Sequence, residues 1–173
     1  MEIEIRLAED EDTVNLLILM QKLMDESDTF TLEQDLTSLQ VEQTADNIER
    51  LNSTANNILL VAAGDNQELF GVISAAALPG HPRIAEVGMA VLKKVQGHGL
   101  AQALLAEVID WANDYSSVDQ LFLTVQSHNQ RAIHIYEKMG FQKITDSNRT
   151  LVNSRGLEVR AFDMVLPIEE LGV

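Results

Sequence analysis

Apolar and polar residues follow two different patterns along the chain, and the change between them falls near residue 58. Residues 3–7 alternate between apolar and charged side chains, as a half-buried strand does. A helix is predicted to begin near Thr13, capped by Asp10 or Asp12, because apolar residues then recur at helical spacing. The expected apolar face of this helix consists of Val14, Leu17, Ile18 and the residues from Met20 or Gln21 through Met24.

One further helix is predicted before residue 58. Residues 25–41 are polar, acidic and only weakly periodic. Over about 42–52 the spacing becomes helical again, and the apolar stripe consists of Val41, Ala45, Ile48 and Leu51. The N-terminal part is therefore predicted to contain one strand and two helices.

Beyond residue 58, short apolar runs bounded by turn residues predict a strand-rich region. Strands are predicted at 58–63, 69–77, 84–91, 121–125, 141–145 and 159–166, and helices at about 99–114 and 129–139. The strand–helix–strand unit across 84–125 requires a parallel pair, whereas the predicted hairpins give antiparallel pairs. We therefore predict an α/β fold with a mixed, mostly antiparallel sheet of about six or seven strands, flanked by about four helices.

The length of 173 residues fits one domain with a core of ordinary size. We expect a single domain over residues 1–173. Its N-terminal part is residues 1–57, and its strand-rich core is residues 58–166.

The charge of the chain is large, negative and uneven. There are 27 acidic and 12 basic residues, a net charge of −15, and residues 1–50 hold 14 of the acids but only 3 of the bases. Such a surface disfavours duplex nucleic acid, which requires patches of Lys and Arg, and it attracts cationic ligands. A charged surface that only keeps the chain soluble is the simpler explanation, and steering of a cation is the alternative.

Several sequence features are absent, and their absence excludes some kinds of chemistry and location. The chain has no cysteine, which excludes disulfides and thiolate catalysis. Its first residues alternate like a strand instead of forming a signal peptide, and no apolar run is long enough to span a bilayer. No His, Asp and Glu residues have the spacing of metal ligands, so no metal is expected. These observations favour a cytoplasmic protein without a membrane or nucleic-acid partner.

Gly97 and Gly99 stand between a strand that ends near Val91 and a helix that begins near Leu100. A helix start leaves several backbone N–H groups without partners and carries the positive end of the helix dipole. Because glycine has no Cβ, a phosphate can approach those N–H groups closely. A plain structural turn explains this one motif equally well. It is not a P-loop, because Gly-Lys-Ser/Thr is missing, and Gln102 stands where a dinucleotide-binding motif has its third glycine.

Two motifs in the expected order resemble a known family. QGHGLA fits the pattern Gln-x-x-Gly-x-Ala, which resembles the acyl-CoA signature of the GNAT superfamily of N-acetyltransferases. AEVGMAVLKKVQGHGLAQALL is similar to that family's fourth strand, glycine turn and third helix, and LFLTVQSHNQRAIHIYEKMGF to its fifth strand and fourth helix. The resemblance covers about 58–166, and the two earlier helices fit the family's more variable substrate-binding part.

This resemblance implies that acetyl-CoA is a co-substrate. Backbone amides from Gly97 to Gln102 would hold its pyrophosphate, and the backbone of Met89 to Val91 would pair with its pantetheine arm. The residues implied in cofactor binding are Met89, Ala90, Val91, Gln96, Gly97, His98, Gly99, Leu100, Ala101, Gln102, Asn129 and Arg131. Gln96 stands where arginine is commoner in the family, and the candidates to supply that charge instead are Lys93, Lys94, Arg131 and Lys138.

The resemblance also implies two catalytic residues, Tyr136 and Glu86. Tyr136 would protonate the departing thiolate, and it shares one helix face with Asn129 and Ala132. Because Tyr136 also belongs to the apolar stripe of this helix, a simple core aromatic is the alternative. Glu86 would accept a proton from the attacking amine, although a strand carboxylate can equally well pair with a cation or face solvent. The amide of Met89 would polarise the acetyl carbonyl.

The predicted reaction is direct transfer of an acetyl group to a primary amine of a small molecule, such as a polyamine or an amino acid, or of a peptide. The alternatives are a domain that binds acyl-CoA without turnover and an acetyltransferase of protein N-termini or lysines. The chain has Thr124 where family members that act on N-termini often have glutamate, which argues against that alternative. His98 and His128 lie beside the implied cofactor positions; contact with phosphate or solvent is the favoured expectation, and a role as base is the alternative. His81 lies in a candidate lid loop. A homodimer that pairs strands in 141–166 is compatible with the pattern.

Overall fold

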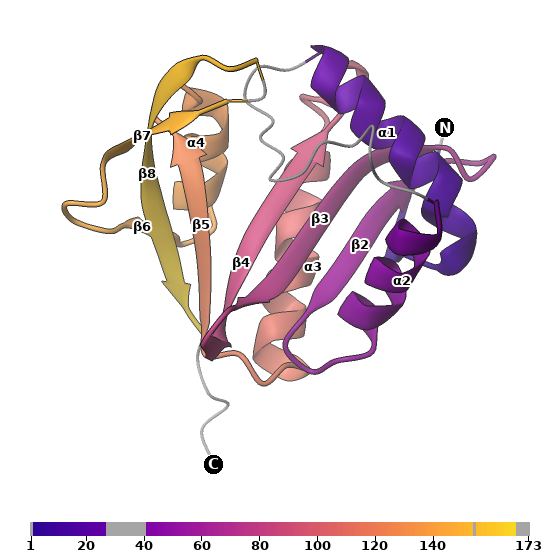
Figure 1. Cartoon of the computed structure of the whole chain (residues 1–173), viewed down its shortest axis with the longest axis horizontal. Helices are drawn as coiled ribbons and strands as arrows, with labels where there is room; N and C mark the ends of the chain where they lie inside the picture. The colour runs from indigo at the N-terminus through magenta and orange to yellow at the C-terminus, as the bar shows by residue number, and fades with distance from the viewer. Residues whose placement is uncertain (1, 27–40, 154, 169–173) are drawn as a thin grey trace.

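The computed structural model describes residues 2–26, 41–153 and 155–168 of the chain (Figure 1). The α-helices in these ranges are α1 (Thr13–Glu26), α2 (Val41–Asn52), α3 (Leu100–Asp114) and α4 (Gln130–Lys138). The strands are β1 (Glu4–Leu7), β2 (Ile58–Ala63), β3 (Leu69–Leu78), β4 (His81–Val91), β5 (Gln120–Gln126), β6 (Gln142–Lys143), β7 (Arg149–Val152) and β8 (Glu158–Pro167). Short 3-10 turns, η1 (Asp10–Asp12) and η3 (Lys93–Val95), precede α1 and α3.

The strands form one mixed sheet in the order β1-β2-β3-β4-β5-β8-β6, and β7 pairs with β8. The pair β4–β5 is parallel, and the other pairs are antiparallel. The predicted fold class is therefore confirmed. The described residues contain eight strands, more than the six or seven predicted. The strand expected over 141–145 is reduced to β6, and β7 was not predicted because most of its residues are exposed and lack apolar alternation.

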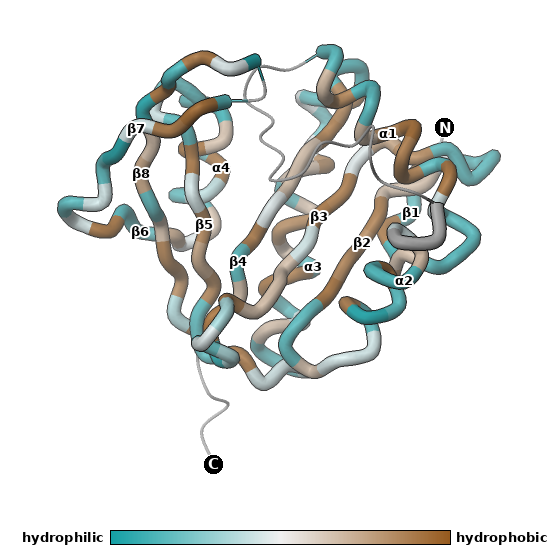
Figure 2. The backbone as a smooth tube through the Cα atoms, in the orientation of Figure 1, coloured by the Kyte–Doolittle hydropathy of each residue, from teal (hydrophilic) through white to brown (hydrophobic). Residues whose placement is uncertain are grey.

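The sheet separates two hydrophobic cores. Helices α3 and α4 cover one face, and α1 and α2 lie over β2 and β3 on the other (Figure 1). The first core joins the sheet to α3 and α4, and its members include Leu104, Leu105, Val108, Leu121, Ile133 and Tyr136. The second joins the sheet to α1 and α2, and its members include Leu19, Leu23, Ile48, Leu59, Val61 and Phe70. Figure 2 shows the hydrophobic stretches along β2 and β3, which have helices on both sides.

Helix α1 presents a different face to the sheet from the one its spacing predicted. Its buried apolar residues are Leu16, Leu19 and Leu23, at positions i, i+3 and i+7. The predicted face was wrong at Val14 and Ile18, whose exposed fractions are 55% and 48%. Because apolar residues occur on almost every side of this helix, the spacing alone does not select one face. The packing against β3 selects it instead.

Two local predictions near the chain turns also need correction. Pro79 and Gly80 form a tight turn between β3 and β4, and His81 already belongs to β4, so the candidate lid loop is wrong. At the start of α1, Asp12 was predicted as one of two candidate caps. Its carboxylate instead accepts a hydrogen bond from the Glu9 N–H at 2.8 Å, in the turn that precedes the helix. Asp12 also accepts two hydrogen bonds from Arg6, at 2.7 and 2.8 Å.

The parallel strands β4 and β5 separate in the middle of the sheet. They pair at only three positions, Ile84–Gln120, Ala85–Leu121 and Glu86–Phe122. Beyond Glu86, β4 stays paired with β3 up to Val91, and β5 stays paired with β8 up to Gln126. In Figure 1 the two strands diverge from this point. We call the opening between residues 87–91 of β4 and 123–126 of β5 the split; it leaves one edge of each strand without a strand partner in the described residues.

No helix in the described ranges combines the length and the apolar character that a membrane crossing requires.

Candidate active site

The glycine turn connects β4 to α3 beside the split. After Leu92 and η3, Gly97 and Gly99 have φ angles of +87° and +79°, in the left-handed region that glycine adopts without a steric penalty. Helix α3 then begins at Leu100, where the sequence predicted it. A side chain at position 99 would meet no atom within 4 Å, so the backbone angle, not crowding, requires glycine there.

The first turn of α3 presents a run of bare backbone N–H groups. The Gln96 N–H donates to Lys93 O, and the next backbone donor along the chain is the Ala103 N–H, which bonds Gly99 O at 3.0 Å. Within the described residues, the N–H groups of residues 97 to 102 make no backbone hydrogen bond, and no side chain caps the helix. Residues 97–99 are exposed. Such a turn fits a phosphate or pyrophosphate, since the N–H dipoles and the helix dipole both favour an anion.

Arg131 of α4 lies beside the glycine turn. Its Nη1 donates to Gln96 Oε1 at 2.8 Å, and Gln96 Nε2 donates to Val91 O at 3.1 Å. A Cβ on Gly97 would lie 3.6 Å from Arg131 Nη2. Of the four basic residues that the sequence offered for this position, the structure therefore brings Arg131 to the turn. Lys94 is placed differently, because its Nζ lies 4.9 Å from the centre of the Phe70 ring.

Helix α4 starts with a capped turn. Asn129 Oδ1 accepts a hydrogen bond from the Ala132 N–H at 3.3 Å, which satisfies one of the free donors of this helix start. In the part of the chain that the structure describes, the Asn129 side-chain amide donates to no protein atom. The cap therefore orients this side chain and leaves its NH₂ group available to a ligand.

Tyr136 belongs to the core between α4 and the sheet. Its exposed fraction is 7%, and its ring centroid lies 5.8 Å from that of Phe141. Burial raises the pKa of Tyr136 to about 12, so the hydroxyl stays protonated across the physiological range. Its hydroxyl makes no hydrogen bond to a described residue. The side chain therefore carries its proton near neutral pH and does not act as a base there.

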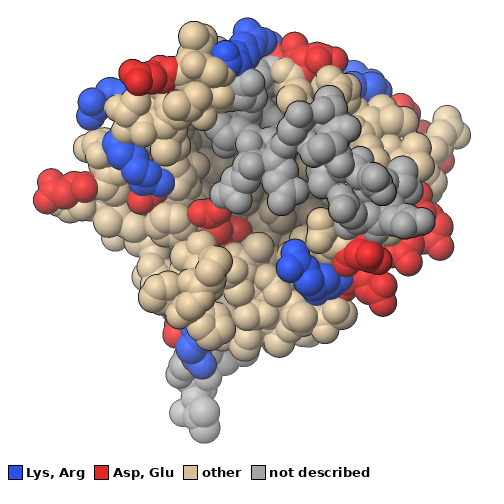
Figure 3. Space-filling model, viewed as in Figure 1, with Lys and Arg blue, Asp and Glu red and all other residues tan. Residues whose placement is uncertain are grey.

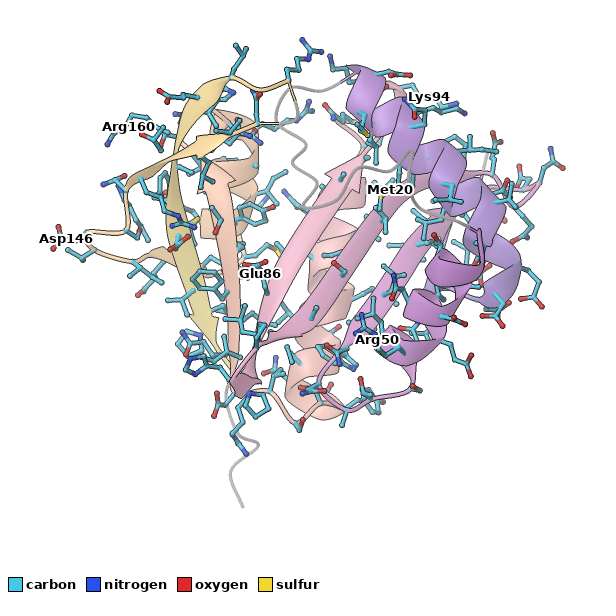
Figure 4. All side chains as sticks on the ribbon, viewed as in Figure 1. Met20, Arg50, Glu86, Lys94, Asp146 and Arg160 are labelled. Atoms are coloured by element: carbon cyan, nitrogen blue, oxygen red, sulfur yellow. The ribbon has the colours of Figure 1, made fainter. Side chains whose placement is uncertain are left out.

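Glu86 lies where β4 and β5 separate, at the last pair before the split (Figure 4). Its neighbours Ala85 and Val87 belong to the core under α3 and α4, so Glu86 points to the opposite face, because side chains alternate along a strand. Tyr136 lies on the α3–α4 side. The two predicted catalytic residues therefore flank the sheet from opposite faces.

Thr124, Arg149 and Asp163 form a polar group near the split that the sequence did not predict. Thr124 Oγ1 donates to Asp163 Oδ1 at 2.7 Å, and Arg149 donates to Asp163 Oδ2 at 2.7 Å and to Thr124 Oγ1 at 3.0 Å. Thr124 was considered only as a departure from a family pattern. The other two residues carried no signal, because they are distant in sequence and β7 was not predicted.

The three histidines considered for the site are exposed: His98 in the glycine turn, His128 before α4 and His81 at the start of β4.

The described ranges contain no group of three His, Cys, Asp or Glu residues that would hold a metal ion. In the space-filling view, basic and acidic side chains both lie along the upper rim, acidic side chains gather at the right edge, and acidic atoms also appear near the centre (Figure 3).

Comparison with known proteins identifies the family. Residues 20–141 match the model of the acetyltransferase (GNAT) family. The chain belongs to this family. This confirms the resemblance that the two motifs carried, and the prediction of an acyltransferase with it.

Individual relatives agree with this assignment. The L-amino acid N-acetyltransferase of Escherichia coli is 32% identical over 108 residues, which cover 61% of this chain and 67% of that protein. Among solved structures, a GNAT acetyltransferase from Streptococcus pneumoniae has a TM-score of 0.87 and 28% identity, and the match covers 96% of this chain and 100% of that one. An acetyltransferase from Salmonella typhimurium, solved with its cofactor acetyl-CoA, shares the fold with a TM-score of 0.80 at 18% identity, over 100% of this chain and 98% of that one.

Proposed function

We propose that this GNAT protein is an N-acetyltransferase that transfers the acetyl group of acetyl-CoA to a primary amine of a small molecule. The observation that carries the proposal is the position of the split: it opens beside the bare N–H groups of the glycine turn. A phosphate group and an extended arm would thereby find a helix start and an unpaired strand edge in one continuous site.

The described residues divide the binding task between backbone and side chains. The N–H groups of residues 97 to 102 and the Arg131 guanidinium would bind the phosphates. The edge of β4 beyond Glu86, including Met89, Ala90 and Val91, would pair with the pantetheine arm, and the Asn129 amide would donate to it. These roles are supported by free donors and by geometry, and they match what the family resemblance implies.

Catalysis would use the two faces of the sheet. Bound acetyl-CoA would supply the activated acetyl thioester. The N–H of Met89 would stabilise negative charge on the carbonyl oxygen. Tyr136 would hold a proton at its hydroxyl for the departing thiolate, because its raised pKa keeps it protonated. From the opposite face, Glu86 would accept a proton from the amine.

Calorimetry with acetyl-CoA and with pantetheine tests the cofactor site. We expect the wild type to bind acetyl-CoA more tightly than pantetheine, because only the former carries the phosphates that the glycine turn fits. Arg131→Gln should weaken acetyl-CoA binding about tenfold, the effect of one charge-assisted contact. Lys138→Gln is the matched control, since it removes a charge from the far end of the same helix, and its affinity should stay within about twofold. A wild-type titration with no heat change would overturn the proposed site.

Turnover is then measured as release of free CoA with a panel of amines. We expect one or more primary amines to give acetyl transfer. Tight binding of acetyl-CoA without release for any amine would instead support the alternative of a domain that binds acyl-CoA without catalysis.

A further inference from the structure

Arg149, Asp163 and Thr124 form a polar network on β7, β8 and β5. The Arg149 guanidinium donates to Asp163 at 2.7 Å, to Thr124 Oγ1 at 3.0 Å and to Ser147 O at 3.4 Å. Asp163 accepts a further hydrogen bond from the Thr124 hydroxyl. The guanidinium is thus held in one orientation by partners on two other strands.

This network lies on the same face of the sheet as Glu86. Glu86 pairs with Phe122, Thr124 follows two residues later on β5, and Thr124 pairs with Asp163 of β8. Paired residues and residues two apart share a face, so the side chains of Glu86, Thr124 and Asp163 project to the same side. Arg149 lies on β7, beyond β8, and it reaches Thr124 only by crossing β8. Its guanidinium therefore points toward the split.

The guanidinium retains binding capacity. It has five N–H donors, of which the described residues engage three. The Arg149 side chain is 42% exposed, whereas that of Asp163 is 15% exposed. A structural ion pair would not require the cationic partner to be the accessible one. A fixed, half-exposed guanidinium is well suited to recognising a planar carboxylate.

We propose that Arg149 binds the carboxylate of the acceptor, and that the acceptor is a free amino acid or a similar amine with a carboxylate close to the reacting nitrogen. The proposal rests on the proposed function. Glu86 at the base of the split provides negative charge for the amine end, and Arg149 at its side provides positive charge for the acid end. Asp163 offsets the charge of Arg149, so it is the two unengaged N–H donors of the guanidinium that favour a zwitterion over a polyamine, although the net charge of −15 attracts cations in general.

The test compares wild type, Arg149→Gln and Arg149→Lys with three sets of probes: the L-amino acids, their carboxamides and spermidine. Arg160→Gln is the matched control, because Arg160 is an exposed arginine of β8 on the opposite face from Asp163. Release of CoA is measured at saturating acetyl-CoA, and binding of the same probes to the CoA-bound protein is measured by calorimetry.

We expect the wild type to prefer an amino acid over its carboxamide by about tenfold or more in kcat/KM, mainly through KM. In Arg149→Gln the preference should fall to about twofold, with Arg149→Lys in between, because lysine keeps the charge but loses the fork. Arg160→Gln should keep the wild-type preference. A purely structural Arg149 would lower the thermal stability of the variant and leave the preference intact.

The outcomes separate this proposal from the proposed function. Turnover of spermidine or of carboxamides as fast as that of amino acids would overturn the role of Arg149 and leave the acetyltransferase function standing. Arg149-dependent binding of amino acids without turnover would support the carboxylate site and contradict the proposed function. Absence of both binding and turnover for every amino acid would overturn the proposal on Arg149.

Discussion

The starts of α3 and α4 follow the two parallel strands, at the same end of the sheet, yet they are built in opposite ways. At α4, Asn129 closes the helix with a side-chain oxygen that accepts from the Ala132 N–H. At α3, Gly99 has no side chain to offer and holds a φ angle of +79°. A side-chain cap stabilises a helix by about 1 kcal/mol. The start of α3 lacks this stabilisation, and the N–H donors of residues 97 to 102 have no backbone partner among the described residues.

From this difference we infer how backbone and side chains would divide the tasks of the proposed site. The α3 start would act through main-chain atoms, and its glycines matter for what they leave open. Helix α4 combines a stabilising cap at Asn129 with Arg131, which lies beside the glycine turn, and it carries Tyr136 in its last turn. Substitutions at the two starts should therefore separate binding, catalysis and stability.

The largest effect is expected from Tyr136→Phe on α4. Removal of the proposed acid should lower kcat by about 100-fold or more. The free energy of unfolding should stay within about 0.5 kcal/mol, because the hydroxyl makes no hydrogen bond to a described residue. Steady-state kinetics and urea unfolding measure the two quantities. Tyr115→Phe is the matched control, since Tyr115 is 80% exposed. An unchanged kcat in Tyr136→Phe would exclude Tyr136 as the acid.

Gly99→Ala tests the α3 start. A φ of +79° should cost this variant about 1–2 kcal/mol of stability, and the added methyl group at the N–H cluster should weaken acetyl-CoA binding about tenfold. Gly80→Ala is the control, because Gly80 has a φ of +78° and equally open surroundings, in the turn between β3 and β4. Unfolding curves should shift equally for both variants. Equal acetyl-CoA affinities in calorimetry would contradict a role of the turn in binding.

Two substitutions at Asn129 separate its cap from its proposed ligand contact. Asn129→Ala should lose about 1 kcal/mol of unfolding free energy. Asn129→Asp keeps a cap oxygen and should retain the stability of the wild type, but it removes the NH₂ donor and should raise the KM for acetyl-CoA several-fold. If Asn129→Asp leaves this KM unchanged, the residue is a cap only.

The smallest effect is expected at the start of α1, as a pH-dependent change in stability when Arg6 is replaced. The hydrogen bonds from Arg6 hold the pKa of Asp12 below its ordinary value of 3.8. A carboxyl with a lowered folded-state pKa stabilises the fold above its unfolded pKa, and this contribution is lost as pH falls through the folded value. Arg6→Gln should therefore be less stable than wild type at neutral pH, and the gap should close in acid. Urea unfolding at several pH values measures it, and a gap independent of pH would contradict the ion pair.

Sequence reasoning succeeded where the determinants are local. Gly97, Gly99 and the start of α3 follow from a few consecutive residues, and Asn129 and Tyr136 share one helix. It failed where contacts join distant segments. Arg131 was one of four positively charged residues considered for the charge near the phosphates. The fold places it against Gln96, 35 residues away in sequence. The network of Arg149, Thr124 and Asp163 joins residues 14 to 39 apart, through a strand that shows no apolar alternation.

The face of α1 that packs on the sheet illustrates a different limit. The helix is apolar on several sides, so hydrophobic spacing leaves its rotation open, and only the shape of the sheet surface decides that Leu16, Leu19 and Leu23 are buried. The prediction of a lid loop around His81 was wrong for a related reason. Pro79 and Gly80 are compatible with a long loop or a tight turn, and the pairing of β3 with β4 decides between them.

The split also has a consequence for how the molecule unfolds. Strands β1 to β4 come from the chain before residue 92, and β5 to β8 from the chain after residue 119, so the described sheet consists of two sequence-contiguous halves. The three residue pairs between β4 and β5 are the strand pairing that joins these halves. Hydrogen exchange should therefore detect two cooperative units, with the amides at the border of the halves protected less than those in the middle of either half.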